Sequence, residues 1–320
     1  MKLDRKKIYR YLIEYRAIMM LLAIFITFSL LSRRFTTVGN ILQVLTNSSI
    51  RAVIVCGQTM VILGSGIDLS VGSLTALCGV ATAILVAGNA LNPVLIILTV
   101  LVIGALGGLV NGLLCIKGKL DPFIVTLSTM VIFRGLSLIM TGGKNIARFN
   151  VPWFLLIGQG KLFGIPVSIL IVTVVGIVPT IVLTRKTIFG RGLYALGGNR
   201  KSTWLSGIRV DRIAIMTYVL TGVTVAIASI ILVSMLASYT TQLGINLEIE
   251  TILAAVIGGV SLLGGRGHVL GAICGVMFVS FLRNGLLILG ISFYLETIII
   301  GIVFIITIVL DRLVQQQLQK

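Results

Sequence analysis

Apolar stretches close to 20 residues long recur along the whole chain of 320 residues, and short polar segments separate them. An α-helix needs about 20 such residues to cross the hydrocarbon core of a bilayer. Seven stretches meet this description: 17–31, 94–115, 122–140, 165–184, 213–236, 269–289 and 293–310. Three more are shorter or broken by glycine: 50–65, 71–87 and 251–263. The pattern predicts an all-α membrane protein, a polytopic helical bundle of about ten transmembrane helices.

The composition excludes an ordinary soluble domain. Hydrophobic residues make up 57% of the chain and charged residues 11%, whereas a soluble domain carries about 25% charged residues. The basic start of the chain precedes the first apolar stretch, but no small-residue cleavage site follows that stretch. We therefore interpret it as a retained span and not as a signal peptide. The prediction is a single transmembrane domain over residues 1–320, embedded in the lipid bilayer.

The positions of the positive charges predict the orientation. A net charge of +17 would indicate a nucleic-acid partner in a soluble protein, but here the basic residues lie mostly between the apolar stretches. With the N-terminus in the cytoplasm, 18 of the 26 Lys and Arg residues fall in cytoplasmic segments and five in external ones. Cytoplasmic segments of membrane proteins carry this excess. We expect cytoplasmic termini, a multi-pass location in a bacterial inner membrane, and no nucleic-acid partner.

The sequence offers little for chemistry on a substrate. Cys56, Cys78, Cys115 and Cys274 lie in apolar surroundings without CxxC spacing, and His268 is the one histidine. We expect no metal site and no catalytic residue, and we interpret the cysteines as small buried apolar side chains. The phosphate-binding pattern GxxxxGK[ST] does not occur. The chain is therefore expected to be no enzyme and to bind no cofactor, so that any ATPase is a separate polypeptide.

The segment GSGIDLSVGS (64–73) interrupts an apolar region with three glycines, three serines and one carboxylate. Irregular backbone at membrane depth is tolerated where it is buried in protein or lines an aqueous cavity, and an ionisable residue there indicates function. We predict that Asp68, Ser70, Gly72 and Ser73 belong to a translocation gate. The alternative is that Asp68 caps the helix that starts near Ser70, and the two roles are compatible.

A second unusual segment is the long connection 185–212, predicted to be a cytoplasmic coupling loop. Its capping signals predict a short helix over about 201–206, with Asn199 as a possible N-cap. Its apolar residues Tyr194, Leu196, Trp204, Leu205 and Ile208 are expected to anchor it. We predict that a cytoplasmic protein docks there. The alternative is that its seven basic residues lie on anionic lipid headgroups.

Small residues and paired acids mark two further regions. Glu248 and Glu250 precede a stretch rich in glycine and alanine up to residue 267. Such small residues let helices approach closely, and the acids fit a solvated helix N-terminus that the helix dipole favours. Four glycines in the fourth predicted span are interpreted as packing positions in the same way: Gly104, Gly107, Gly108 and Gly112.

Three of these segments together resemble one known family. GSGIDLSVGS (64–73), LGGN (196–199) with LSGI (205–208), and AAVIGG (254–259) with GGRG (264–267) are similar to segments of the ribose-type monosaccharide permeases of ABC importers. The resemblance keeps the same order over nearly the whole chain. The chain departs from the family at residues 200–204, RKSTW, where relatives commonly place an acid followed by alanines.

The resemblance implies a set of partners and roles. Such a permease works as a homodimer or with a paralogous permease, carries ATP-binding cassette subunits that use the ATP, and receives its cargo from a periplasmic sugar-binding protein. The family's coupling helix corresponds to the neighbourhood of 199–208. The coupling residues expected on this basis are Gly197, Gly198, Asn199, Ser206, Gly207 and Ile208. The cargoes of the family include ribose, other monosaccharides, polyols and autoinducer-2.

Two hypotheses of other classes compete with an ABC permease. An ion-coupled secondary transporter needs ionisable groups inside the membrane, and Asp68, Arg134, Arg283 and Glu296 are available, but the docking segment would then have no role. A membrane scaffold that transports nothing would not need a polar interruption at membrane depth. The expected function is therefore the membrane-spanning permease subunit of an ATP-driven importer for a small sugar.

Overall fold

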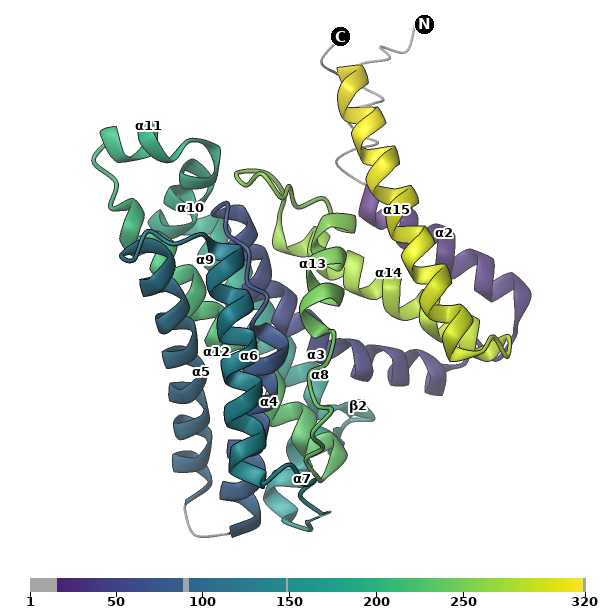
Figure 1. Cartoon of the computed structure of the whole chain (residues 1–320). Helices are drawn as coiled ribbons and strands as arrows, with labels where there is room; N and C mark the ends of the chain where they lie inside the picture. Colours follow the sequence, from purple (N-terminus) through teal and green to yellow (C-terminus); the bar gives the residue numbers. More distant parts are fainter. Residues whose placement is uncertain (1–15, 89–91, 148, 319–320) are drawn as a thin grey trace, which may run out of the picture.

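The computed structural model describes residues 16–88, 92–147 and 149–318, and these residues are mostly helical (Figure 1). The first part contains α2 (Arg16–Leu31), α3 (Val38–Leu63), α4 (Val71–Gly88), α5 (Pro93–Ile116), α6 (Pro122–Thr141) and α7 (Pro152–Gln159). A small hairpin follows, formed by β1 (Lys161–Leu162) and β2 (Ile165–Pro166). The rest contains α8 (Val167–Ile171), the π-helix η1 (Val172–Ile177), α9 (Val178–Lys186), α10 (Ile188–Gly198), α11 (Arg200–Leu205), α12 (Val210–Leu236), α13 (Leu247–Ile257), α14 (Val269–Ile288) and α15 (Phe293–Leu318).

Seven helical segments in the described part are long and apolar enough to cross a membrane: α3, α4, α5, α6, the continuous run from α8 to α9, α12 and α14. Shorter apolar helices lie at 17–31 and 294–306. The chain is therefore an all-α, multi-pass membrane protein, as predicted. Each of the ten apolar stretches in the sequence has a helix in the structure, although α3 begins at Val38, earlier than expected, and α13 ends at Ile257.

The helices form two groups with separate apolar cores. The larger group is built around α12, which packs against α3, α4 and α5. The smaller group consists of α2, α14 and α15, where Phe28, Phe35, Phe281 and Phe304 pack together. Figure 1 shows this group beside the main bundle, with α13 and α14 leading into it. Helices α3, α13 and α14 contribute residues to both cores and so join them.

Glycine brings α5 and α12 into backbone contact. Gly104, Gly108 and Gly112 recur every four residues along one face of α5. A Cβ on Gly104 would collide with the carbonyl of Gly222, and one on Gly108 would collide with the carbonyl of Tyr218. Small residues at this spacing allow such close packing in membranes. The interpretation of these glycines as packing positions is confirmed.

Local signals begin several helices where the sequence places them. The Asp121 carboxylate accepts a hydrogen bond from the Phe123 N–H at 2.9 Å, and Pro122 follows as the first helical residue. Asn92 caps α5 in the same way before Pro93. Proline at the first helical position loses no hydrogen bond. In contrast, Pro179 lies inside the α8–α9 run, and the π-helical turn η1 precedes it.

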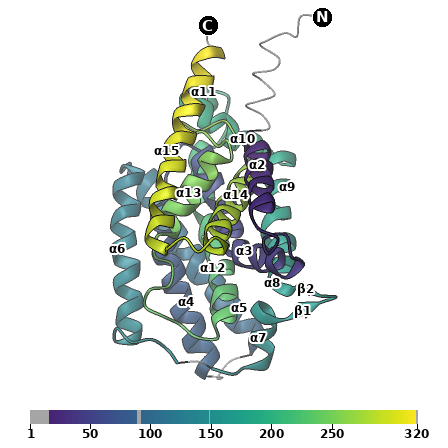
Figure 2. The same ribbon diagram turned by 90° about the vertical axis from the view of Figure 1, so that its right-hand side faces the viewer.

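The two ends of the molecule differ. Helices α10 and α11 lie at one end, together with the end of α15 (Figure 1). Helix α7 and the β1–β2 hairpin lie at the opposite end, and Figure 2 shows the hairpin projecting there. We call these the α11 end and the hairpin end. The sequence predicted neither α7 nor the hairpin, because each is too short to produce a periodic pattern.

The glycine contact between α5 and α12 gives a first prediction. Gly108→Val would place three carbons where the backbone of Tyr218 lies, so we expect the protein to lose its monodisperse folded form or to melt at least about 10 °C lower in detergent. Thermal unfolding by intrinsic fluorescence measures this. Gly301→Val in α15 is the control, because a Cβ there meets nothing within 4 Å. Equal stability of both variants with the parent chain would contradict close packing.

Candidate functional site

The segment 64–70 is an irregular piece of backbone inserted among helices. It leaves the end of α3 and runs to the start of α4 at Val71. The Ile67 carbonyl lies 3.4 Å from the Tyr218 hydroxyl of α12 and 3.5 Å from the Thr126 hydroxyl of α6. The later part of the segment, around Asp68 and Ser70, is buried in the bundle, whereas Ser65 is exposed. The surrounding protein therefore supplies the hydrogen bonds that lipid cannot.

Asp68 is buried at 1% exposure and holds the start of α4. Its Oδ1 accepts hydrogen bonds from the Ser70 N–H at 2.8 Å and from the Ser70 hydroxyl at 2.6 Å. The amide of Asn111 on α5 donates to the same hydroxyl at 2.8 Å, and Gln58 on α3 donates to the Asp68 carbonyl at 3.2 Å. These bonds give Asp68 a local structural role in the turn that precedes α4, although the N–H that it binds lies just before the helix and not within its first turn. They also tie three helices to one turn of chain.

The three segments that carry the family resemblance meet at the α11 end. We define the junction as the contact among Leu63 and Ser65 after α3, Gly197 at the end of α10, and Leu263 and Gly265 in the turn after α13. The Gly265 N–H donates to the Leu63 carbonyl at 2.9 Å. The Ser65 hydroxyl lies 3.2 Å from the Gly197 carbonyl and 3.0 Å from the Leu263 carbonyl. A Cβ on Gly197 would collide with the Leu63 carbonyl, so α10 touches the backbone of α3 directly.

Tyr194 strengthens the junction from α10. Its hydroxyl donates to the Gly267 carbonyl at 2.9 Å. Burial raises the pKa of Tyr194 above its ordinary value, so the hydroxyl remains a proton donor across the physiological pH range. Helix α10 is thereby held to the turn between α13 and α14 by a side chain as well as by close backbone packing.

Helix α11 has the cap that the sequence predicted. It spans Arg200–Leu205, and the Asn199 side chain accepts from the Ser202 N–H at 2.9 Å. The expectation that all apolar residues here anchor the segment is wrong for two of them. Leu196 is buried, but Trp204 is 63% exposed and Leu205 is 68% exposed. Among the predicted coupling residues, Gly198, Asn199, Ser206 and Gly207 are exposed, while Gly197 and Ile208 are half-buried.

An exposed ion pair joins α11 to α12, and a second ion pair joins the same carboxylate to the α5–α6 connection. Arg200 lies 2.8 Å and Lys117 3.3 Å from the two carboxylate oxygens of Asp211. Exposed pairs of this kind contribute at most about 1 kcal/mol each. A cleft of about 550 Å³, lined by Arg200, Asp211 and the connection from α5 to α6, lies beside the helix. Few contacts therefore oppose a displacement of α11.

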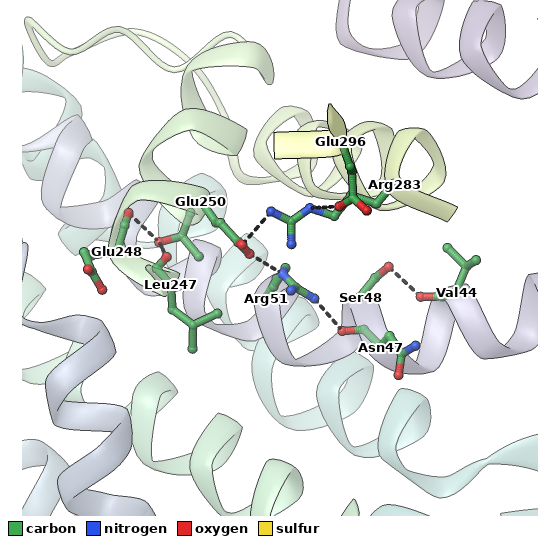
Figure 3. Close-up of polar contacts among 10 residues, drawn as sticks. Val44, Asn47, Ser48, Arg51, Leu247, Glu248, Glu250, Arg283 and Glu296 are labelled. Atoms are coloured by element: carbon green, nitrogen blue, oxygen red, sulfur yellow. Dashed lines mark hydrogen bonds and ion pairs between the residues drawn. The ribbon is translucent and has the colours of Figure 1, made fainter. Parts of the chain in front are cut away.

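A cluster of four charges joins the two helix groups (Figure 3). We call Arg51, Glu250, Arg283 and Glu296 the charge cluster; they come from α3, α13, α14 and α15. Glu250 lies 2.5 Å from Arg51 and 2.7 Å from Arg283. Arg283 also lies 3.5 Å from Glu296. The carboxylate side chains are 15% and 10% exposed, so the solvated position expected for Glu250 is wrong.

The second acid of α13 points elsewhere. Figure 3 shows Glu248 directed away from the charge cluster. Its carboxylate lies against Gly72 in the first turn of α4, where a Cβ would collide with it. Ser73, Arg134 and Glu248 line one cleft. All four predicted gate residues are buried: Asp68 and Ser70 lie in the turn before α4, and Gly72 and Ser73 lie beside this cleft.

Other sites have less support in the described residues. There, no group of three or more His, Cys, Asp or Glu residues could hold a metal ion. The four cysteines are free, and Cys56, Cys78 and Cys115 are buried. An irregular connection packed among helices and seven membrane-capable segments are together typical of a multi-pass transport protein.

Comparison with known proteins identifies the family. The sequence profile described as branched-chain amino acid transport system / permease component matches residues 40–308. The chain is 41% identical to the ribose import permease protein RbsC of Haemophilus influenzae, over 83% of each chain. It is 41% identical to that of Bacillus subtilis, over 89% of this chain and 88% of the relative. It is also 36% identical to the autoinducer 2 import system permease protein LsrC of Yersinia enterocolitica, over 82% and 72%. No solved structure matches the chain.

The chain belongs to the ribose-type monosaccharide permease family of ABC importers. The resemblance found in the three sequence segments is thereby confirmed, and so is the expected class of multi-pass inner-membrane transport protein. Members of this family are transport subunits and not catalysts.

The charge cluster gives a second prediction. Glu250→Gln removes the negative partner of two arginines, and breaking a buried ion pair costs about 3 kcal/mol. Glu296→Gln removes one contact at 3.5 Å and is expected to cost less. Thermal unfolding in detergent should therefore rank the parent chain above Glu296→Gln, and Glu296→Gln above Glu250→Gln. The reverse order would show that Glu250 does not hold the cluster together.

Proposed function

We propose that the chain is the membrane-spanning permease subunit of an ATP-driven importer that moves a small sugar such as ribose across the bacterial inner membrane. The named relatives with the highest identity import ribose, and they cover most of the chain. Permeases for D-allose and autoinducer 2 are related at 34% and 36% identity. Autoinducer 2, other monosaccharides and polyols are therefore the alternative cargoes.

The proposed topology has ten crossings with the α11 end in the cytoplasm. The crossings are α2, α3, α4, α5, α6, the α8–α9 run, α12, α13, α14 and α15. This assignment puts the basic residues of α9 to α12 in the cytoplasm, in agreement with the positive-inside rule. Both termini are then cytoplasmic. The hairpin end faces the periplasm, where a sugar-binding protein would deliver cargo.

The exposed apolar surface of α11 carries the proposal of an ATPase partner. Trp204 and Leu205 are more than 60% exposed on a short helix beyond the membrane-capable helices. Exposed aromatic residues of this kind are typical anchors of protein interfaces. A separate ATP-binding cassette subunit docks there and uses the ATP, while this chain binds no cofactor. Residues 185–212 are then the coupling segment, and a second permease copy or a paralogue completes the importer.

The junction supplies a route for the coupling. A displacement of α11 moves α10, and Gly197 transmits the movement to Leu63 and Ser65 by direct contact. The segment 64–70 then shifts at its other end, where Asp68 and Ser70 start α4. Gly72 and Ser73 follow Ser70 within one turn of α4. The movement therefore also reaches the cleft that Ser73 lines together with Arg134 and Glu248. These four residues act as the gate in this scheme.

An ion-coupled transporter has weaker support. Two of its four candidate groups, Arg283 and Glu296, are paired with each other in the charge cluster. Asp68 is engaged by Ser70. The docking surface on α11 would have no role. An ATPase measurement separates the two classes, as follows.

The importer hypothesis predicts ATPase activity only in a complex. The chain in lipid nanodiscs should hydrolyse no ATP, whereas its complex with an ATP-binding subunit should hydrolyse ATP faster in the presence of a sugar-loaded binding protein. Proteoliposomes that hold the complex should take up ribose only with ATP. Uptake by the chain alone down an ion gradient would overturn the ABC assignment.

Substitutions at two adjacent glycines, Gly197 and Gly198, test the docking of the ATPase and the folding of the chain separately. A side chain on Gly198 meets nothing within 4 Å, whereas one on Gly197 collides with backbone of α3. We expect Gly198→Leu to leave the thermal stability of the chain unchanged and to lower cargo-stimulated ATP hydrolysis at least about fivefold. Gly197→Leu should lower the stability as well. Full stimulation in a folded Gly198→Leu complex would remove α11 from the coupling interface.

A further inference from the structure

A cleft of about 400 Å³ opens between α4, α6 and the residues that lead into α13. We call it the α4–α6–α13 cleft. Its polar residues are Ser73, Arg134, Asn246 and Glu248, and its apolar wall includes Met130, Val131 and Leu138. The α6 residues that line it run from the middle of that helix to near its end. The cleft therefore lies part of the way along the bundle, within the length of a membrane-capable helix.

The charged groups of the cleft are fixed in place. Arg134 Nη1 donates to the Leu243 carbonyl at 2.8 Å and to the Thr241 carbonyl at 3.3 Å. The Glu248 carboxylate is seated against the bare backbone of Gly72. Arg134 of α6 and Glu248 of α13 thus present one positive and one negative group to the same space, and each is held by backbone of a neighbouring segment. Fixed polar groups of this kind orient a ligand.

We propose that the α4–α6–α13 cleft is a low-affinity contact site for a neutral polyhydroxylated molecule of monosaccharide size on the translocation route. Ligand sites typically measure about 300–1,000 Å³, and this cleft falls in that range. The inference rests on the proposed function for its place in transport, but the binding property can be tested without it.

The net charge of the cleft lining indicates which class of ligand the cleft binds. One guanidinium and one carboxylate leave the lining without net charge, so neither an anion nor a cation is favoured. The Arg134 guanidinium donates hydrogen bonds, and the Glu248 carboxylate accepts them. The Ser73 hydroxyl and the Asn246 amide can do both. A sugar offers hydroxyl groups of both kinds and a C–H face for the apolar wall. A transported solute must also be released. A small number of polar contacts in an open cleft is consistent with the weak binding that release requires.

Cysteine labelling tests the binding directly. Val131 lines the cleft and is 66% exposed, whereas its neighbour Ile132 is 55% exposed and does not line it. Val131→Cys and Ile132→Cys are each labelled with a thiol reagent in the full chain in nanodiscs. The probes are D-ribose and D-ribose 5-phosphate, and the unmodified chain gives the background from its own cysteines.

We expect D-ribose to slow labelling at position 131 at least about threefold and to leave position 132 unchanged. D-ribose 5-phosphate should protect less, because the Glu248 carboxylate repels its phosphate and Arg134 is already bound to two carbonyl oxygens. Absence of protection at position 131, equal protection at both positions, or better protection by the phosphorylated sugar would overturn the proposal.

A transport measurement tests the place of the cleft on the route. In the reconstituted importer, Val131→Trp should lower ribose uptake at least about tenfold and leave cargo-stimulated ATP hydrolysis within about twofold of the parent. Ile132→Trp is the matched control and should transport normally. Normal uptake by Val131→Trp would overturn the proposal. Failure of the parent complex to transport ribose would instead overturn the proposed function. The labelling experiment does not depend on transport, so it would still test binding in the cleft.

Discussion

Backbone amide and carbonyl groups inside a membrane protein must find partners within the protein. Regular helices meet this condition by themselves, but residues 64–70 do not. Their polar groups need the end of α3, the side chains of Asn111 and Tyr218, and the turn after α13. The need for partners therefore brings together segments that lie almost 200 residues apart in the chain. The same contacts that satisfy the interruption also connect it to α10.

These contacts fasten the irregular segment at both of its ends. On one side of the segment, close contacts with Gly197 leave no space between α10 and α3. On the other side, Asp68 and Ser70 fix the first turn of α4. A segment fastened at both ends transmits displacement, whereas a flexible loop would absorb it. Packed contacts of this kind favour switching between discrete arrangements over gradual deformation.

Much of the fold follows from the sequence, because span length and hydropathy determine where helices cross a bilayer. The cap at Asn199 was also predicted, since it depends on a few adjacent residues. Helix α10 was not, because four glycines lower its intrinsic preference and buried contacts of Leu193 and Leu196 stabilise it instead. The charge cluster was also missed, because Arg51 and Glu250 pair across 199 residues. The exposure of Trp204 depends on the position of α11 in space, which its residues do not encode.

The seating of Glu248 opposite Arg134 has an electrical consequence. A membrane potential acts on a moving charge with about 2.3 kcal/mol per elementary charge per 100 mV. A carboxylate and a guanidinium that shift together carry no net charge through that field, and a neutral sugar adds none. A joint shift of this pair would therefore do no work against the membrane voltage.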